Sequence, residues 1–289
     1  MGVRDGFLSK VARLDRRWIF LAILLSVALP FVVPIEFEAM PSEETLRFDR
    51  ALGRALDTGR PLVIGVDFGP QTMAELEPVL LAIMHRVFAA GGEAVFLTFM
   101  PEAASPLRAY LARMEEEHDL VYGRDYVFLG YASSYAYTIY GMGASIETYF
   151  HEDDRGTPIR DLELMKDLGN LTEAAAVLNV ASNSMPKFWI QYGVAPLDLD
   201  FLVACTAVQA TDYFPYLQTG QLDGLLAGGR AGAEYEGLLV DAGVLPEPGD
   251  ATRGLGSQSL AIFAILAFIA LGNAGYFLGR RRDAGGGRP

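Results

Sequence analysis

Two long apolar runs, one near each end of the chain, constrain this protein more than any other feature of its sequence. The first runs from Trp18 to Ile35 and the second from Ser259 to Gly279, and neither contains a charged residue. A helix needs about 20 apolar residues to cross roughly 30 Å of hydrocarbon. A buried core helix would usually carry a polar stripe, which both runs lack. The sequence therefore predicts two transmembrane helices, at 18–35 and 259–279.

The charges that flank the two runs predict the topology. The terminal tails, residues 1–17 and 280–289, each have a net charge of +3, whereas the segment between the tails carries −19. Basic residues concentrate on the cytoplasmic side of a membrane. We therefore expect both termini in the cytoplasm of a two-span cell-membrane protein, with the central segment outside the cytoplasm and the lipid bilayer as a partner.

A cleaved signal peptide is the alternative interpretation of the first run. Ser26-Val27-Ala28 has small residues at the spacing of a cleavage site. The apolar run nevertheless continues beyond it through Phe31, Val32 and Val33. We favour an uncleaved anchor, and cleavage would leave one carboxy-terminal span with the same central domain.

The second run places small residues where a helix–helix contact would need them. Small side chains let two helix backbones approach closely, and an amide can hydrogen-bond across the contact. The first span or another subunit, including a second copy, would supply the partner helix, although Ala and Gly are also common in such helices without a contact. The candidate packing residues are Ala267, Ala270, Asn273, Ala274, Gly275 and Gly279.

The segment 40–245 alternates between strand and helix patterns, and 246–258 reads as a linker rich in Pro and Gly. Continuous apolar runs between amphipathic helices indicate parallel strands covered on both faces. The sequence therefore predicts an α/β domain of Rossmann-like form, with a mainly parallel sheet and helices on both faces. The five expected strands are 61–67, 94–99, 126–130, 174–181 and 201–208.

Capping signals predict where several helices begin. Thr72-x-x-Glu75 has the form of a capping box, and Pro78 suggests a regular helix from near Glu77. Ser105-Pro106 reads as an N-cap followed by the first helical residue, and the stretch 221–240 as mostly helical.

The candidate binding site follows from the geometry of a parallel sheet. All its strands point the same way, so the loops that follow them emerge along one edge, where ligands bind in such folds. We expect the loops 67–71, 131–134, 182–184 and 211–221 to converge on one polar cleft. Its candidate residues are Asp67, Gln71, Ser134, Asn183, Asp212, Tyr213, Gln218 and Gln221.

Motifs for specific chemistry are weak. Cys205 lies inside an apolar strand, where cysteine behaves as a small hydrophobic residue. His85 and His118 are far apart in sequence and do not match the spacing of zinc ligands, so no metal site is predicted. No complete nucleotide-binding or nucleophile motif occurs, and nothing identifies a cofactor. The formal charge of −13 argues against a nucleic-acid partner, because phosphates are bound by Lys and Arg.

Three classes of function remain open. The leading hypothesis is a membrane-anchored extracytoplasmic binding or assembly module without enzymatic activity, which could belong to a membrane complex. The first alternative is an extracytoplasmic hydrolase or metal-dependent enzyme that uses the strand-end loops, with Asp67 and Asp212 as its carboxylates. The second is a subunit of a transporter or secretion complex. Its two spans would serve as docking helices rather than a pore, because two helices alone cannot line a channel.

Overall fold

The computed structural model describes residues 15–32 and 40–285, in two compact units. One unit, Glu38–Thr252, is an α/β domain. The other, formed by Met1–Phe37 together with Arg253–Pro289, contains two apolar helices.

The domain is built on one six-stranded sheet in which every strand pair is parallel. Its order is β3-β2-β1-β4-β5-β6, the order of doubly wound dinucleotide-binding folds. This confirms the predicted α/β class, and the five predicted strands are all present with shifted bounds. The strands are β1 (Leu62–Asp67), β2 (Ala94–Thr98), β3 (Tyr126–Tyr131), β4 (Val177–Ala181), β5 (Phe201–Cys205) and β6 (Gly224–Ala227).

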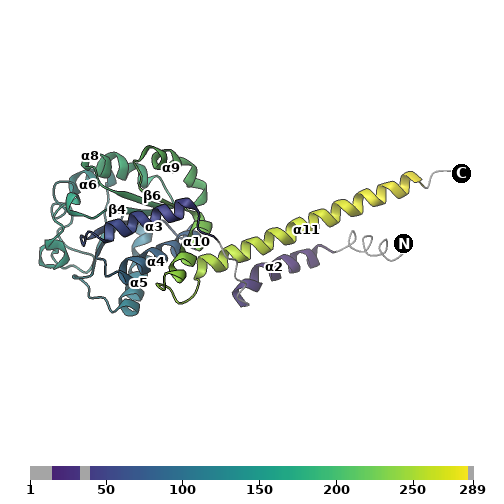
Figure 1. Cartoon of the computed structure of the whole chain (residues 1–289), viewed down its shortest axis with the longest axis horizontal. Helices are drawn as coiled ribbons and strands as arrows, with labels where there is room; N and C mark the ends of the chain where they lie inside the picture. The colour runs from purple at the N-terminus through teal and green to yellow at the C-terminus, as the bar shows by residue number, and fades with distance from the viewer. Residues whose placement is uncertain (1–14, 33–39, 286–289) are drawn as a thin grey trace. The chain divides into compact units, whose positions relative to one another are not determined.

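Helices cover both faces of the sheet, and each face has its own hydrophobic core (Figure 1). One face carries α3 (Glu43–Leu56), α4 (Met73–Ala89), α5 (Pro101–His118) and α10 (Gly228–Asp241). The other carries α6 (Tyr135–Met142), α7 (Met185–Trp189), the π-helix η4 (Ile190–Val194), α8 (Ala195–Leu197) and α9 (Ala207–Thr219). Three 3-10 turns precede β4: η1 (Ile159–Asp161), η2 (Leu164–Lys166) and η3 (Leu171–Glu173).

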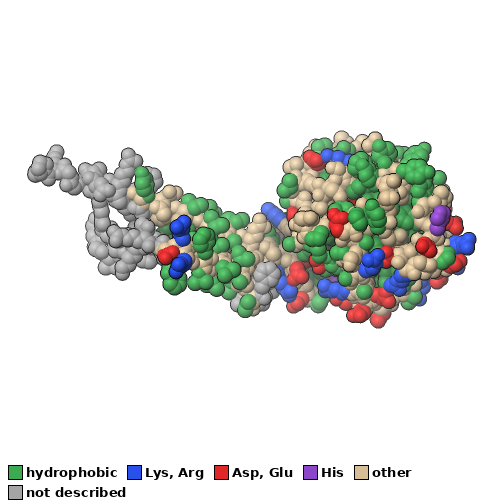
Figure 2. Space-filling model, turned by 180° about the vertical axis from the view of Figure 1, so that it is seen from behind, with side chains coloured by type: hydrophobic (Ala, Val, Ile, Leu, Met, Phe, Trp, Pro, Cys, Tyr) green, Lys and Arg blue, Asp and Glu red, His purple; other side chains and the backbone are tan. Residues whose placement is uncertain are grey.

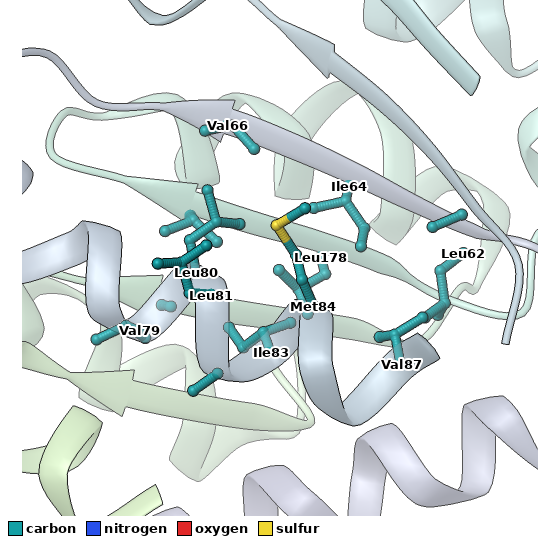
Figure 3. Packing of buried hydrophobic residues seen from close by; sticks show 14 of the residues in the cluster. Leu62, Ile64, Val66, Val79, Leu80, Leu81, Ile83, Met84, Val87 and Leu178 are labelled. Atoms are coloured by element: carbon teal, nitrogen blue, oxygen red, sulfur yellow. The ribbon is translucent and has the colours of Figure 1, made fainter. Parts of the chain in front are cut away.

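The packing of α4 on β1 shows why these strands lack polar alternation. Successive side chains of a strand point to opposite faces. Ile64 belongs with Leu80 and Met84 to the core beneath α4, whereas Val63 belongs to the core of the opposite face (Figure 3). Because both faces are covered, every residue of β1 is buried.

Two predicted helix starts are wrong by about one turn. The helix after β1 begins at Met73 rather than near Glu77, so Thr72 is its N-cap residue as predicted, but the Thr72 side chain makes no capping bond. Glu75 does not complete a capping box, because its carboxylate accepts a hydrogen bond from Ala207 N at 2.8 Å instead. The next helix begins at Pro101. Two prolines lie within its first six residues, and the sequence pattern did not show which of them opens the helix.

Two further predictions on the second half of the chain are corrected. Part of the stretch 221–240 is the strand β6, because a short apolar run next to a helix has no periodicity that separates strand from helix. Most of the predicted loop 211–221 belongs to the helix α9.

The second unit holds α2 (Arg16–Val32) and α11 (Asp250–Gly285). Within the described residues, one helical stretch, Asp250–Ala274, is long and apolar enough to cross a membrane. The segment α2 covers the first predicted span up to Val32, and residues 33–35 lie outside the described part of the chain. Since α11 already begins at Asp250, most of the predicted linker 246–258 is helical.

Hydrophobic side chains dominate the visible surface of these two helices (Figure 2). Ser257 Oγ of α11 donates to Val27 O of α2 at 2.6 Å. The predicted packing residues Ala267, Ala270, Asn273 and Ala274 are exposed, and for Gly275 and Gly279 only the helical backbone is described. A contact through these six residues therefore stays a prediction.

Candidate functional site

The strand order places a topological switch point between β1 and β4. Strands lead away from this point in both directions, so the connections that follow β1 and β4 diverge, and ligands of open α/β sheets bind at the carboxyl ends of two such strands. Ser182 N, directly after β4, donates to Asp67 O at the end of β1 at 3.1 Å. The residues after these two strands are thus the natural place for a binding site.

Asp67 is a fully buried carboxylate at this switch point. Its oxygens accept hydrogen bonds from Phe99 N at 2.7 Å and from Asn179 Nδ2 at 2.8 Å, with Thr98 Oγ1 at 3.4 Å. Burial nevertheless raises the pKa of Asp67 to about 6, because desolvation of the charged form outweighs these donors. A group of this kind is typical of functional sites, although structural networks produce the same shift.

Trp189 of α7 packs against β1 at Gly65, two residues before this carboxylate. A Cβ on Gly65 would lie 2.7 Å from Asn179 Nδ2 and 3.2 Å from Trp189 Nε1. The absence of a side chain at Gly65 therefore lets the indole edge and the amide pack against the strand. Trp189 Nε1 and Asn179 Oδ1 are both buried without a hydrogen-bond partner among the described residues.

Polar side chains continue from Asp67 towards the surface. Asn183 Nδ2 contacts Met100 Sδ at 3.0 Å, and Asn183 O accepts a hydrogen bond from Tyr213 Oη at 3.1 Å. One turn away, Lys187 Nζ lies 2.7 Å from Asp212 Oδ2 in a partly exposed ion pair. We call Asp67, Asn183, Lys187, Asp212 and Tyr213 the switch-point cluster.

Exposed aromatic side chains flank this cluster. The Tyr135 ring of α6 packs on the Phe188 ring of α7 with centroids 4.4 Å apart, and Tyr131 at the end of β3 is 47% exposed. Ser134, just before α6, has a left-handed backbone (φ 57°), which is uncommon for a residue other than glycine and marks local strain. The π-helix η4 follows α7, and such elements occur frequently at functional sites.

The structure brings together part of the predicted site. Asp67, Asn183, Asp212 and Tyr213 lie in one hydrogen-bonded and ion-paired neighbourhood, and Gln71 lies beside Gly69 in the connection after β1. Ser134 follows β3 at the same edge.

Gln218 and Gln221 do not belong to this site. They lie at the carboxyl end of α9, and the helix of a parallel crossover runs back to the edge where the next strand begins. Both therefore lie near the opposite edge of the sheet.

Several residues of the site were missed at the sequence level. Thr98, Asn179 and Trp189 sit inside apolar patterns, so their polar atoms gave no separate signal. Lys187 joins the site only because α7 and α9 are neighbours in space. Tyr135 could have been predicted, because it directly follows the candidate residue Ser134 in the connection after a predicted strand.

The electrostatics of this edge disfavour a phosphate ligand. The amino end of a helix attracts anions, but Glu75 already occupies that of α9 through its bond to Ala207 N. The connection Phe68-Gly69-Pro70-Gln71 lacks the glycine fingerprint of a dinucleotide site. The cation Lys187 is neutralised by Asp212.

Metal and nucleophile chemistry also lack a complete set of groups. No group of three or more His, Cys, Asp or Glu that could hold a metal ion is found within the described residues. Burial raises the pKa of the Cys205 thiol to about 12, which keeps it protonated and unreactive. His85 and His118, distant in sequence, are in contact through Nδ1 and Nε2 at 2.9 Å, near the carboxyl ends of α4 and α5.

Comparisons with models of protein families, with curated proteins and with solved structures found no match.

Proposed function

We propose that this chain is a membrane-anchored binding or assembly module whose α/β domain recognises a ligand or partner at the switch-point cluster. The observation that carries this proposal is the convergence of Asp67, Asn183, Asp212 and Tyr213 at the carboxyl ends of β1 and β4. Aromatic side chains, which are enriched in recognition surfaces, border this cluster at Tyr131 and Tyr135.

The chemistry of the cluster favours a neutral polar ligand or a protein surface. Its ionisable surface groups, Lys187 and Asp212, are already paired with each other, and the partly exposed Asn183 is neutral and polar. The enzymatic alternative has less support. Asp67 is fully buried, and Asp212 is committed to Lys187, so the two carboxylates do not act as a pair.

Native mass spectrometry of the full chain in mild detergent tests the proposal. We expect a bound species, either a small molecule or a protein, whose occupancy falls at least tenfold in Asp212→Ala, because this exposed side chain borders the cluster. Gln218→Ala is the matched control, since it alters the other end of the same helix and should retain the bound species. Absence of any bound species, equal loss in both variants, or a large drop in Tm for Asp212→Ala would contradict the proposal.

We further propose that two spans anchor the domain outside the cytoplasm, with both termini inside. The long apolar stretch of α11 and the basic terminal tails support this topology. A cysteine at the exposed position Glu152 should react with a membrane-impermeant maleimide in intact cells. The buried native Cys205 should stay unlabelled and serves as the internal control. Labelling of Glu152→Cys only after lysis would reverse the topology.

A further inference from the structure

Two histidines outside the switch-point cluster face each other between α4 and α5. His85 lies in the last part of α4, and His118 is the last residue of α5. His85 Nδ1 and His118 Nε2 are 2.9 Å apart, and the two ring centroids are 5.1 Å apart. Ring nitrogens at this distance share a hydrogen bond, because two lone pairs or two N–H groups would repel each other. This histidine pair therefore connects the carboxyl ends of the two helices.

The contact limits how many protons the histidine pair can hold. A neutral imidazole has one N–H donor and one acceptor nitrogen, whereas an imidazolium has two donors and no acceptor. The hydrogen bond can form when both rings are neutral or when one of them is charged. With both rings charged, two N–H groups would face each other and two positive charges would repel across the contact. The closed contact therefore excludes the second proton.

The surroundings of His85 reinforce this limit. The charged groups that act on it all belong to α5 and are Glu117, His118 and Arg113. Glu117 Oε2 lies 3.5 Å from His85 Nε2 and favours one charge on the pair, but this carboxylate also accepts a hydrogen bond from Arg113 Nε at 2.7 Å. Burial has the largest effect and lowers the pKa of His85, whose side chain is only 14% exposed. The neighbouring cation on α4, Arg86, is paired with a carboxylate of α3.

An aromatic part of the hydrophobic core lies next to the contact. The ring of Phe88 is 6.1 Å from the ring of His118 and 6.4 Å from the rings of both Phe96 and Tyr126. These three aromatic residues are buried. Separation of the ends of α4 and α5 would expose the ring of Phe88 to water. The histidine pair thus covers one part of the core, and its hydrogen bond depends on the number of bound protons.

We propose that the histidine pair is an acid-sensitive contact, which opens when both rings become protonated and then releases the end of α5 from α4. In the open state each ring is solvated and carries its own charge, whereas the closed state holds one charge at most. The open state therefore binds one proton more, at the ordinary histidine pKa of 6.5. The contact is stable above this pH, and its population falls by up to about tenfold for each pH unit below it.

Hydrogen–deuterium exchange of the full chain in mild detergent tests the proposal, with EDTA present so that no metal ion bridges the rings. We expect the protection factors of amides in the last turns of α4 and α5 to fall at least tenfold between pH 7.5 and pH 5.0, after correction for the intrinsic exchange rate. His118→Gln should remove most of this fall, because an amide can still hydrogen-bond to His85 but takes up no proton.

His151→Gln is the matched control for this substitution. The chain has three histidines, and His151 is the exposed one that takes no part in the pair. This variant should show the same fall in protection as the unmodified chain. Equal protection at the two pH values, or an equal pH response of His118→Gln and His151→Gln, would overturn the proposal.

NMR of the unmodified chain with labelled histidine rings measures the proton count directly. We expect His85 and His118 to titrate as a coupled pair whose second step lies at least one pH unit below the single step of His151. Independent titration of the two rings near the pH at which His151 titrates would contradict the closed contact. These results do not bear on the switch-point cluster, because α4 and α5 run from the carboxyl edge of the sheet back to the opposite edge.

Discussion

Replacing Gly65 with valine is expected to lower the free energy of unfolding by about 3 kcal/mol, as overpacking of a dense core does. The position is closed on three sides, with Asn179 Nδ2, Trp189 Nε1 and Asp67 Oδ2 all within 3.5 Å of where a Cβ would lie. The amide cannot simply move away, because it donates to both Gly65 O and Asp67 Oδ2. Urea unfolding of the full chain in detergent, followed by tryptophan fluorescence, measures this loss.

Gly229→Val provides the matched control. A Cβ at Gly229 meets nothing within 4 Å, so the same substitution there should cost less than about 1 kcal/mol, the scale of helix propensity. Equal losses at the two positions would show that valine acts through backbone preference. A wild-type-like Gly65→Val would mean that Trp189 does not pack on β1 as described.

The parallel sheet and the edge that carries the site could be predicted from the sequence, because both depend on local patterns. Apolar runs such as 61–67 are long enough, and helices such as α4 periodic enough, to separate strand from helix. Once the strands are parallel, the residues that follow them share one edge, whereas the adjacency of β1 and β4 depends on the strand order. The sequence therefore predicted Asp67 and Asn183 at one edge, but not that they follow neighbouring strands.

The remaining features depend on contacts between distant segments. The strand β6 is only four residues long and runs directly into α10, so its identity is decided by pairing with β5 rather than by its own sequence. Gln218 was assigned to the wrong edge for the same reason. The segment 211–221 was predicted as a loop, but most of it belongs to α9, which carries Gln218 to the opposite edge of the sheet. Lys187 was missed since its partner Asp212 lies 25 residues away.

The switch-point cluster contains a buried carboxylate, Asp67, which costs stability, and a partly exposed ion pair, Lys187 with Asp212. The buried carboxylate of Asp67 does not stabilise the domain at neutral pH, since an apolar or neutral side chain could fill the same space without desolvation of a charge. Its hydrogen bonds to Phe99 N and Thr98, however, fix the connection from β2 into α5, from which Met100 contacts Asn183. We therefore regard Asp67 as a positioning residue for the surface above it.

The free energy of unfolding is expected to depend strongly on pH, because Asp67 titrates in the buried site. The pKa of Asp67 is about 6 in the folded domain, against an ordinary value of 3.8. Because the folded state binds its proton more tightly, stability from this group is fully present below about pH 4 and is lost as the pH rises through 6. The loss amounts to about 3 kcal/mol. The difference in unfolding free energy between wild type and Asp67→Asn should change by that amount between pH 3 and pH 7.5.

The comparison of the two chains at each pH isolates Asp67 from other titrating groups, which both chains share. Asp212→Asn is the control within the same cluster. Its carboxylate is exposed and paired with Lys187, and exposed pairs contribute less than about 1 kcal/mol, so its difference from wild type should stay small across the range. A difference between wild type and Asp67→Asn that is constant with pH would show that Asp67 is solvated in the folded protein rather than buried. A change of opposite sign would mean that the donors Phe99 N and Asn179 Nδ2 outweigh desolvation, which makes Asp67 a stabilising anchor of the switch point.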